Sequence, residues 1–182
     1  AKELGVNCYD RELLRMASDD SGINEALFGQ SDERLKKMPL FHIAKQVYKG
    51  EILPPDSDDY ASEENLFNYQ AKVIRELAKT ESCVIIGRCG NYAYAGEKEL
   101  LRVFLCGNKE DRIARLMEKH QVSRREAAIT IDKTENRRRA YHKFYTGQEW
   151  GYAGNYDLCI NDSNMGVEGT IEMIMCELQY KR

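Results

Sequence analysis

The sequence predicts an α/β protein in which one parallel sheet lies between layers of helices. Three short runs are apolar at consecutive positions, which is typical of strands buried on both faces of a parallel sheet. Helical patterns of about 10–15 residues separate the runs, and this alternation indicates βαβ units. The three predicted strands cover residues 83–86, 103–106 and 158–160, and a weaker one covers residues 6–9.

An insertion interrupts this alternation early in the chain. Residues 21–61 contain helical patterns over 25–36 and 40–48, followed by an acidic loop. No strand pattern occurs there, so we expect a helical insertion. Because single domains run to about 100–200 residues, we expect one domain over residues 1–182.

The remaining helices have readable start signals. Ser62 is placed to cap a helix over residues 63–79. Asn108 opens a second helix. A capping box at residues 123–126 begins a third, long helix, and residues 167–181 form the fourth.

The composition is that of a globular protein. Hydrophobic residues make up 42% and charged residues 31% of the chain, which excludes the disordered and fibrous classes. No apolar run approaches the ~18 residues that span a bilayer, so we expect no membrane partner and a cytoplasmic location. The six cysteines form no Cys-x-x-Cys pair, and we expect reduced thiols.

Charge is unevenly distributed along the chain. The net charge is −3, which argues against a general affinity for nucleic acid. Residues 51–64 hold six acids and no base, whereas residues 124–143 hold seven bases and three acids. A basic segment in an acidic protein indicates a small anionic ligand.

Polar residues follow two of the predicted strands. Asp10 and, one turn later, Arg15 follow the first, and Gly87 and Arg88 follow the next. Ligands of open α/β sheets bind outside the carboxyl ends of the strands. Arg88 is therefore a candidate to bind a phosphate, and Asp10 a candidate to hold a substrate hydroxyl or a metal-bound water. The structural alternatives are an ion pair at a turn for Arg88 and a helix cap for Asp10.

Three consecutive arginines, Arg137, Arg138 and Arg139, lie in the long third helix. Arg138 follows Ile131 by seven residues, so the two lie about 20° apart around the helix axis and Arg138 interrupts an apolar stripe. Such an arginine needs an anion or must extend to solvent. The cluster suits a phosphoryl group, whose charge is spread over three oxygens. The alternative is a solvated basic face.

Other chemistries have weaker support. The three histidines, His42, His120 and His142, are too scattered to indicate a metal site, and we predict no metal ligands. Cys89 has no identifiable histidine partner as a nucleophile. The aromatic residues over 141–150 could stack a base, although their helical spacing is more typical of a core.

Four segments of the chain carry a family resemblance. They are residues 5–10 (Gly-Val-Asn-Cys-Tyr-Asp), 86–89 (Ile-Gly-Arg-Cys), 137–147 (Arg-Arg-Arg-Ala-Tyr-His-Lys-Phe-Tyr-Thr-Gly), and Trp150 with 155–158 (Asn-Tyr-Asp-Leu). In this order and spacing they resemble the cytidylate-kinase-like family of P-loop kinases, over nearly the whole chain.

The resemblance implies a nucleoside monophosphate kinase fold. Residues 21–61 would be the substrate-binding insertion, and residues 123–150 an arginine-bearing lid. The resemblance also implies transfer of the γ-phosphoryl group of ATP to a monophosphate, with Mg²⁺.

The candidate residues acquire roles from this resemblance. Arg88, with Gly87 and Arg15, would hold the acceptor phosphate, and Asp10 would orient the acceptor. The cluster Arg137–Arg139 would stabilise the transferred group.

The sequence departs from the family at two places. Cytidylate kinases have Gly-Arg-Asp where this chain has Gly87-Arg88-Cys89, which leaves the accepted base open. The glycine-rich loop that cradles ATP phosphates has no counterpart, so the ATP-binding residues are unassigned. We expect roughly 20–25 residues, a strand, the loop and most of a helix, to precede Ala1.

The leading hypothesis is a cytoplasmic kinase for a nucleoside monophosphate resembling CMP or dCMP. A P-loop kinase for another small molecule is one alternative. A catalytically silent nucleotide-binding or interaction domain is the other, and the oligomeric state is left open.

Overall fold

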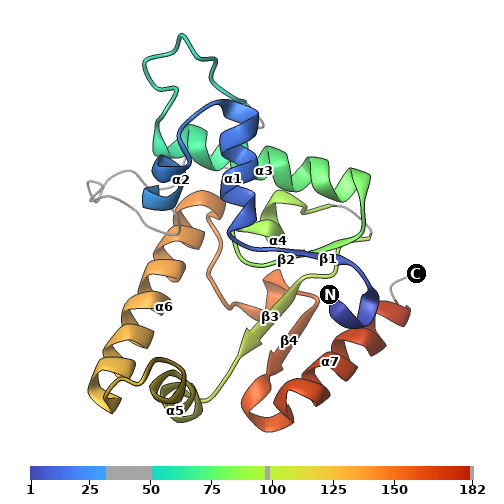
Figure 1. Ribbon diagram of the computed structural model, residues 1–182. Helices are drawn as coiled ribbons and strands as arrows, with labels where there is room; N and C mark the ends of the chain where they lie inside the picture. The colour runs from blue at the N-terminus through green and yellow to red at the C-terminus, as the bar shows by residue number, and fades with distance from the viewer. Residues whose placement is uncertain (32–50, 97–98, 181–182) are drawn as a thin grey trace. The chain divides into compact units, whose positions relative to one another are not determined.

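The computed structural model describes residues 1–31, 51–96 and 99–180 (Figure 1). These residues form an α/β protein with pairs of parallel strands, as the sequence predicts. In chain order the elements are η1 (Lys2–Leu4), β1 (Asn7–Tyr9), α1 (Glu12–Ser21), α2 (Glu25–Ser31), α3 (Glu63–Thr80), β2 (Cys83–Ile85), α4 (Gly90–Ala93), β3 (Val103–Cys106), α5 (Lys109–His120), α6 (Arg124–Thr146), η2 (Ala153–Asn155), β4 (Leu158–Asn161) and α7 (Asp162–Tyr180).

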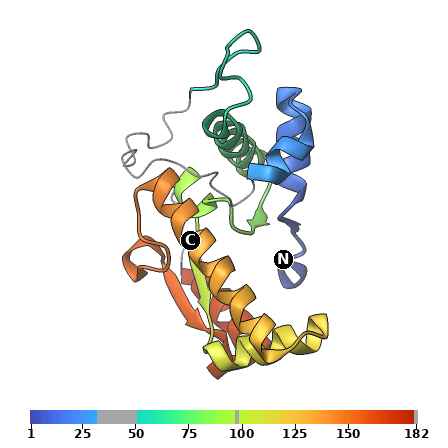
Figure 2. The same cartoon turned by 90° about the vertical axis from the view of Figure 1, so that its left-hand side faces the viewer.

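The chain divides into two compact units. The first comprises residues 1–96 and 141–147, and the second comprises residues 97–140 and 148–182. Helix α6 is one uninterrupted helix, as Figure 2 shows, and contributes residues to both units.

In the first unit, β1 and β2 pair in parallel, with Cys8 opposite Val84. Helix α3 supplies much of the core because it buries one apolar face, including Ile74 and Leu77. Its first turn is capped as predicted, since the Ser62 side chain accepts a hydrogen bond from the Asn65 backbone N–H.

The last turns of α6 belong to this core. The ring of Tyr145 stacks on Phe67 of α3 with 4.1 Å between centroids. Tyr141 packs against the same phenylalanine in an edge arrangement. Both tyrosines are buried, which confirms the preference for a core role that their helical spacing indicated.

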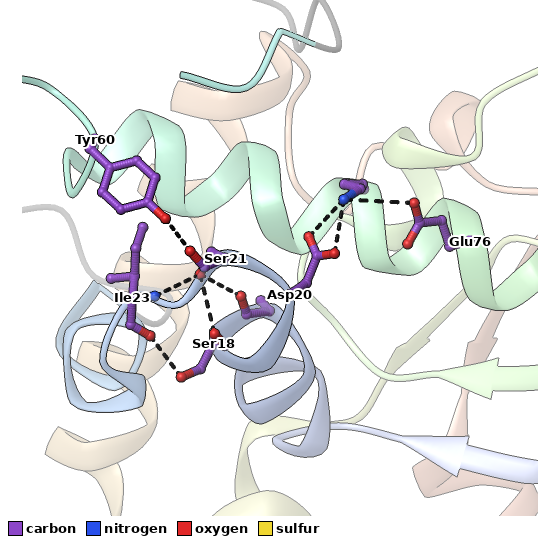
Figure 3. A network of polar contacts seen from close by, with 8 residues as sticks. Ser18, Asp20, Ser21, Ile23, Tyr60 and Glu76 are labelled. Carbon is purple, nitrogen blue, oxygen red and sulfur yellow. Dashed lines mark hydrogen bonds and ion pairs between the residues drawn. The ribbon is translucent and has the colours of Figure 1, made fainter. Parts of the chain in front are cut away.

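One hydrogen bond joins the two ends of the predicted insertion, and a second lies at its first end (Figure 3). The Tyr60 hydroxyl donates to the backbone carbonyl of Ser21. The Ser18 hydroxyl donates to the carbonyl of Ile23 at 2.7 Å. Helix α2 lies within the helix predicted over 25–36, whereas the helix predicted over 40–48 lies outside the described residues.

In the second unit, β3 and β4 pair in parallel, with Phe104 opposite Cys159. Helix α6 begins with the predicted capping box: the Glu126 carboxylate accepts from the Ser123 backbone N–H, and the Ser123 hydroxyl accepts from the Glu126 N–H. Helix α7 changes direction at Gly166, which has a φ of 68°.

The strands are less buried than their apolar runs predicted. Leu105 in β3 is 52% exposed, and Ile86 just after β2 is 50% exposed. Among the described residues the strands form two two-stranded sheets, so every strand is an edge strand. Parallel strand pairs are thus confirmed, and one three-layer sheet stays a prediction.

Candidate functional site

A cavity of about 290 Å³ opens in the second unit, at the carboxyl ends of β3 and β4. This is near the lower end of the ~300–1,000 Å³ typical of small-molecule sites. Gly107 follows β3 and Asp162 follows β4, as expected for ligand sites of parallel sheets. The charged side chains in the lining are Arg112, Arg115, Glu135, Arg138 and Asp162.

An ion pair defines the strand end of the cavity. Arg115 donates two hydrogen bonds to the Asp162 carboxylate, at 2.6 and 3.2 Å. The hydrogen bond to Arg115, followed by its charge, lowers the pKa of Asp162 below its usual range. A Cβ at Gly107 would collide with an Asp162 oxygen and lie 3.0 Å from an Arg115 nitrogen, so a larger residue here would displace the ion pair.

A second ion pair lies across the cavity from α5 to α6. Nη1 of Arg112 donates to the Glu135 carboxylate, and both side chains are half-buried. Nε of Arg112 is buried and makes no hydrogen bond to any residue in the described ranges. Arg112 thus keeps one donor that no described residue uses.

Apolar and aromatic side chains form another part of the cavity wall, beside the hydroxyl groups of Thr130 and Thr134. Leu105, Leu116 and Ile131 contribute to it, as does Trp150. Trp150 is held in an edge contact with Phe104, at 5.2 Å between ring centroids. Guanidinium groups beside apolar and aromatic side chains suit a ligand with an anionic part and a planar part.

The predicted arginine cluster is divided between different environments. Arg138 is exposed and lines the cavity together with Ile131, the residue whose side of the helix it was expected to share. Arg137 is half-buried. Arg139 is exposed and donates to the side chain of Asn136 at 3.1 Å.

The first unit holds the other predicted site residues. Arg88 is only 5% exposed and donates from Nη2 to the Asp10 carboxylate at 3.3 Å. The structure therefore brings Arg88 and Asp10 together. The N-cap position of α1 is Arg11, without a side-chain capping bond, so Asp10 does not take its alternative role.

Arg88 lies on a tight turn of unusual backbone conformation. The Gly90 N–H donates to the Gly87 carbonyl at 2.9 Å, which closes the turn. Gly87 has a φ of 73°, and Arg88 and Cys89 both have a φ of 54°. Two successive non-glycine residues in the left-handed region are strained, and such strain clusters at functional sites.

Arg15 is exposed and pairs with Asp19 in its own helix at 3.6 Å. An exposed pair four residues apart contributes little to stability. Its predicted role at the acceptor phosphate stays a prediction.

Comparison of the sequence with known protein families gives one match. The sequence profile described as the cytidylate kinase-like family matches residues 1–164. The chain belongs to the cytidylate kinase-like family. This membership supports a nucleotide kinase activity in general terms.

A solved structure has a similar fold. It is an uncharacterized protein from Eubacterium ventriosum, with a TM-score of 0.64 and 22% sequence identity, over 92% of this chain and 90% of that chain. At this identity the likeness concerns the fold alone. No curated protein matches the chain.

Sequence reasoning missed four residues of this cytidylate kinase-like protein: Arg112, Arg115, Glu135 and Asp162. A signal for three of them was present. Asp162 directly follows a strand, and the two arginines lie three residues apart in the helix after another strand. Only the pairing of Arg112 with Glu135 needed the tertiary structure.

The described residues include no group of three side chains able to hold a metal ion by themselves. In that part of the chain no helix has the length and apolar character that crossing a membrane requires. Mg²⁺ is commonly held by one or two carboxylates together with substrate phosphates. Both carboxylates of the cavity, Glu135 and Asp162, are already paired with arginines, so among the described residues they offer Mg²⁺ no unpaired carboxylate, whereas the guanidinium groups are of a kind that binds phosphate oxygens.

Proposed function

We propose that this protein is a cytoplasmic phosphotransferase that moves the γ-phosphoryl group of ATP to a nucleoside monophosphate, of which CMP and dCMP are the leading candidates. One observation carries the proposal. Three arginines from two helices, Arg112, Arg115 and Arg138, line a single cavity at the ends of two parallel strands. Family membership supports the same class of reaction.

The cavity would take the triphosphate nucleotide. Arg112 and Arg115 would hold phosphate oxygens, and the apolar wall with Trp150 would face the planar base. Mg²⁺, when bound, supplies positive charge to the phosphates.

The acceptor would bind at the Arg88 turn. Arg88 would hold the acceptor phosphate beside Gly87, with Arg15 as a further cation and Asp10 orienting the acceptor. A buried guanidinium is favoured over lysine here because its donors form a rigid fork. Cys89 replaces the aspartate of cytidylate kinases, so base selection is an open part of this proposal.

In the transfer step, an acceptor phosphate oxygen forms a bond to the γ-phosphorus while the bond to the β–γ bridging oxygen breaks and ADP leaves. Negative charge is spread over the transferred oxygens. The cluster Arg137–Arg139 would stabilise that charge, which is the main means of catalysis in phosphoryl transfer.

A nucleotide panel tests the proposal. The full-length protein with ATP and Mg²⁺ should convert CMP or dCMP to the diphosphate, measured by chromatographic separation of products. Turnover of a different small molecule would support another kinase activity. Absence of turnover with every monophosphate would overturn the proposal and favour a silent binding domain.

Arg138→Ala tests the role of the cluster. Loss of a transition-state donor should lower kcat by about 100-fold, with a smaller rise in KM for the acceptor. Arg125→Ala removes an exposed arginine elsewhere on α6 and serves as the matched control, with kcat within about 2-fold of wild type. An unchanged kcat in Arg138→Ala would contradict the assigned role.

A further inference from the structure

The strained turn that carries Arg88 needs support from its surroundings. Left-handed conformations at Arg88 and Cys89 are intrinsically unfavourable for residues with a Cβ. Such conformations persist only where neighbouring contacts determine them. The elements next to the turn are α4, which begins at Gly90, and the last turns of α6.

A buried histidine of α6 contacts α4. His142 is 4% exposed, and its Nε2 lies 3.4 Å from the side-chain nitrogen of Asn91. Asn91 is the residue directly after the turn. One turn further along α6, Tyr145 lies close enough to Cys89 for that thiol to contribute to the raised pKa of the tyrosine.

The hydrogen bonds around His142 specify its tautomer. The Thr146 hydroxyl donates its single proton to the His142 backbone carbonyl at 2.6 Å. The same hydroxyl oxygen lies 3.2 Å from Nδ1, so it can only accept there, and Nδ1 carries the proton. In a neutral imidazole Nε2 is then an acceptor, which matches the amide N–H of Asn91.

We propose that His142 is a positioning residue that fixes the acceptor-binding conformation of Arg88, by accepting a hydrogen bond from Asn91 and so anchoring the turn that carries the arginine. The role rests on the proposed function, because Arg88 is the proposed ligand of the acceptor phosphate. His142 itself does not touch the acceptor.

Two substitutions of His142 distinguish the role of Nε2 as a hydrogen-bond acceptor from the effects of side-chain size and polarity. His142→Gln keeps an acceptor near the place of Nε2, whereas His142→Asn keeps a donor near Nδ1 and loses that acceptor. His142→Asn should raise KM for the acceptor monophosphate by about 10-fold, the size expected for one lost hydrogen bond. The kcat value and the KM for ATP should stay within about 2-fold. His142→Gln should resemble wild type.

A double variant tests whether the effect passes through Arg88. In an Arg88→Ala background, His142→Asn should no longer change the acceptor KM, because coupled residues are not additive. Equal behaviour of the Asn and Gln variants, or an undiminished effect of His142→Asn without Arg88, would overturn the proposal. If His142→Asn fails to fold, Asn91→Ala removes the donor instead and should raise the acceptor KM in the same way.

Hydrogen exchange gives a readout that does not depend on catalysis. The backbone N–H of Gly90 closes the turn, and it should exchange about 10-fold faster in His142→Asn than in wild type or His142→Gln. If wild type phosphorylates no monophosphate, the proposed function fails, yet the exchange rates still decide the anchoring role. Equal exchange in all three proteins would overturn it.

Discussion

Glu135 occupies a position where its carboxylate competes with an anionic ligand. It accepts from Arg112 inside the cavity, so the arginine proposed to bind ATP phosphates already has a counter-ion. Glu135→Gln removes this charge and keeps the side-chain size. We expect ATP to bind about 2-fold to 10-fold more tightly, since a partly buried ion pair of this kind is worth on the order of 1 kcal/mol. Isothermal titration calorimetry measures the change.

Asp132→Asn is the matched control for that measurement. Asp132 pairs with Lys109 between the same two helices at 2.6 Å, but it is exposed and outside the cavity lining. Its removal should leave ATP affinity unchanged. Weaker ATP binding by Glu135→Gln would contradict competition and would indicate that Glu135 orients Arg112 for the ligand.

At the scale of a single element, the start of α3 depends on its cap. Ser62 satisfies one N–H of the first turn, which otherwise has no partner within the helix. Ser62→Ala should lower the free energy of unfolding by about 1 kcal/mol in urea denaturation followed by circular dichroism. Ser62→Asp retains an acceptor and should be close to wild type, and equal losses in both variants would exclude capping as the cause.

The junction of the insertion is also an element with a testable role. Tyr60 donates to the Ser21 carbonyl and so ties the end of the insertion to its beginning (Figure 3). Tyr60→Phe should accelerate amide exchange in residues 51–61 by several-fold to about 10-fold, because one hydrogen bond is lost. Exchange in α5 should be unaffected. Uniform acceleration throughout the chain would indicate general destabilisation instead.

For the whole molecule, we expect stability to fall at alkaline pH. Burial, followed by the nearby Glu63 and Cys89, raises the pKa of Tyr145 above its ordinary value of 10.0. The folded state therefore holds the phenolic proton more tightly than the unfolded state. The stabilisation is fully present below pH 10 and is lost as pH rises above it, at up to about 1.4 kcal/mol per pH unit for this one group.

Tyr145→Phe should make that alkaline loss shallower, measured as the free energy of unfolding at pH 9 and pH 11. Tyr180→Phe is the control, because Tyr180 is 81% exposed and should leave the slope unchanged. The same slope in wild type and Tyr145→Phe would show that other groups cause the alkaline loss.

The fold was predictable where local chemistry decides it. The alternation of apolar runs with helical patterns predicted parallel strands. The capping residues Ser62 and Ser123 predicted where two helices begin. Burial of the strands was less predictable. An apolar run such as residues 103–106 indicates that these residues favour a strand. How exposed the strand is depends on how many other strands and helices pack around it.

The candidate site was predictable only in part. Arg88 and Asp10 were predicted because ligands of open α/β sheets bind at the carboxyl ends of the strands. In the structure the two residues form an ion pair. The pairing of Arg112 with Glu135 depends on how two helices cross, which no local pattern encodes. The environment of His142 was hidden for the same reason, because scattered histidines carry no sequence signal of their contacts.

At the turn Gly87–Gly90, the residues that would best stabilise the backbone differ from those that would bind the ligand. Asparagine or glycine fits the two left-handed positions best, so a library screened for heat resistance alone should replace Arg88 and Cys89 with them. Enrichment for nucleotide binding should instead preserve the arginine. Sequencing the survivors of the two screens side by side would therefore show whether residues 88 and 89 owe their identities to folding or to the ligand.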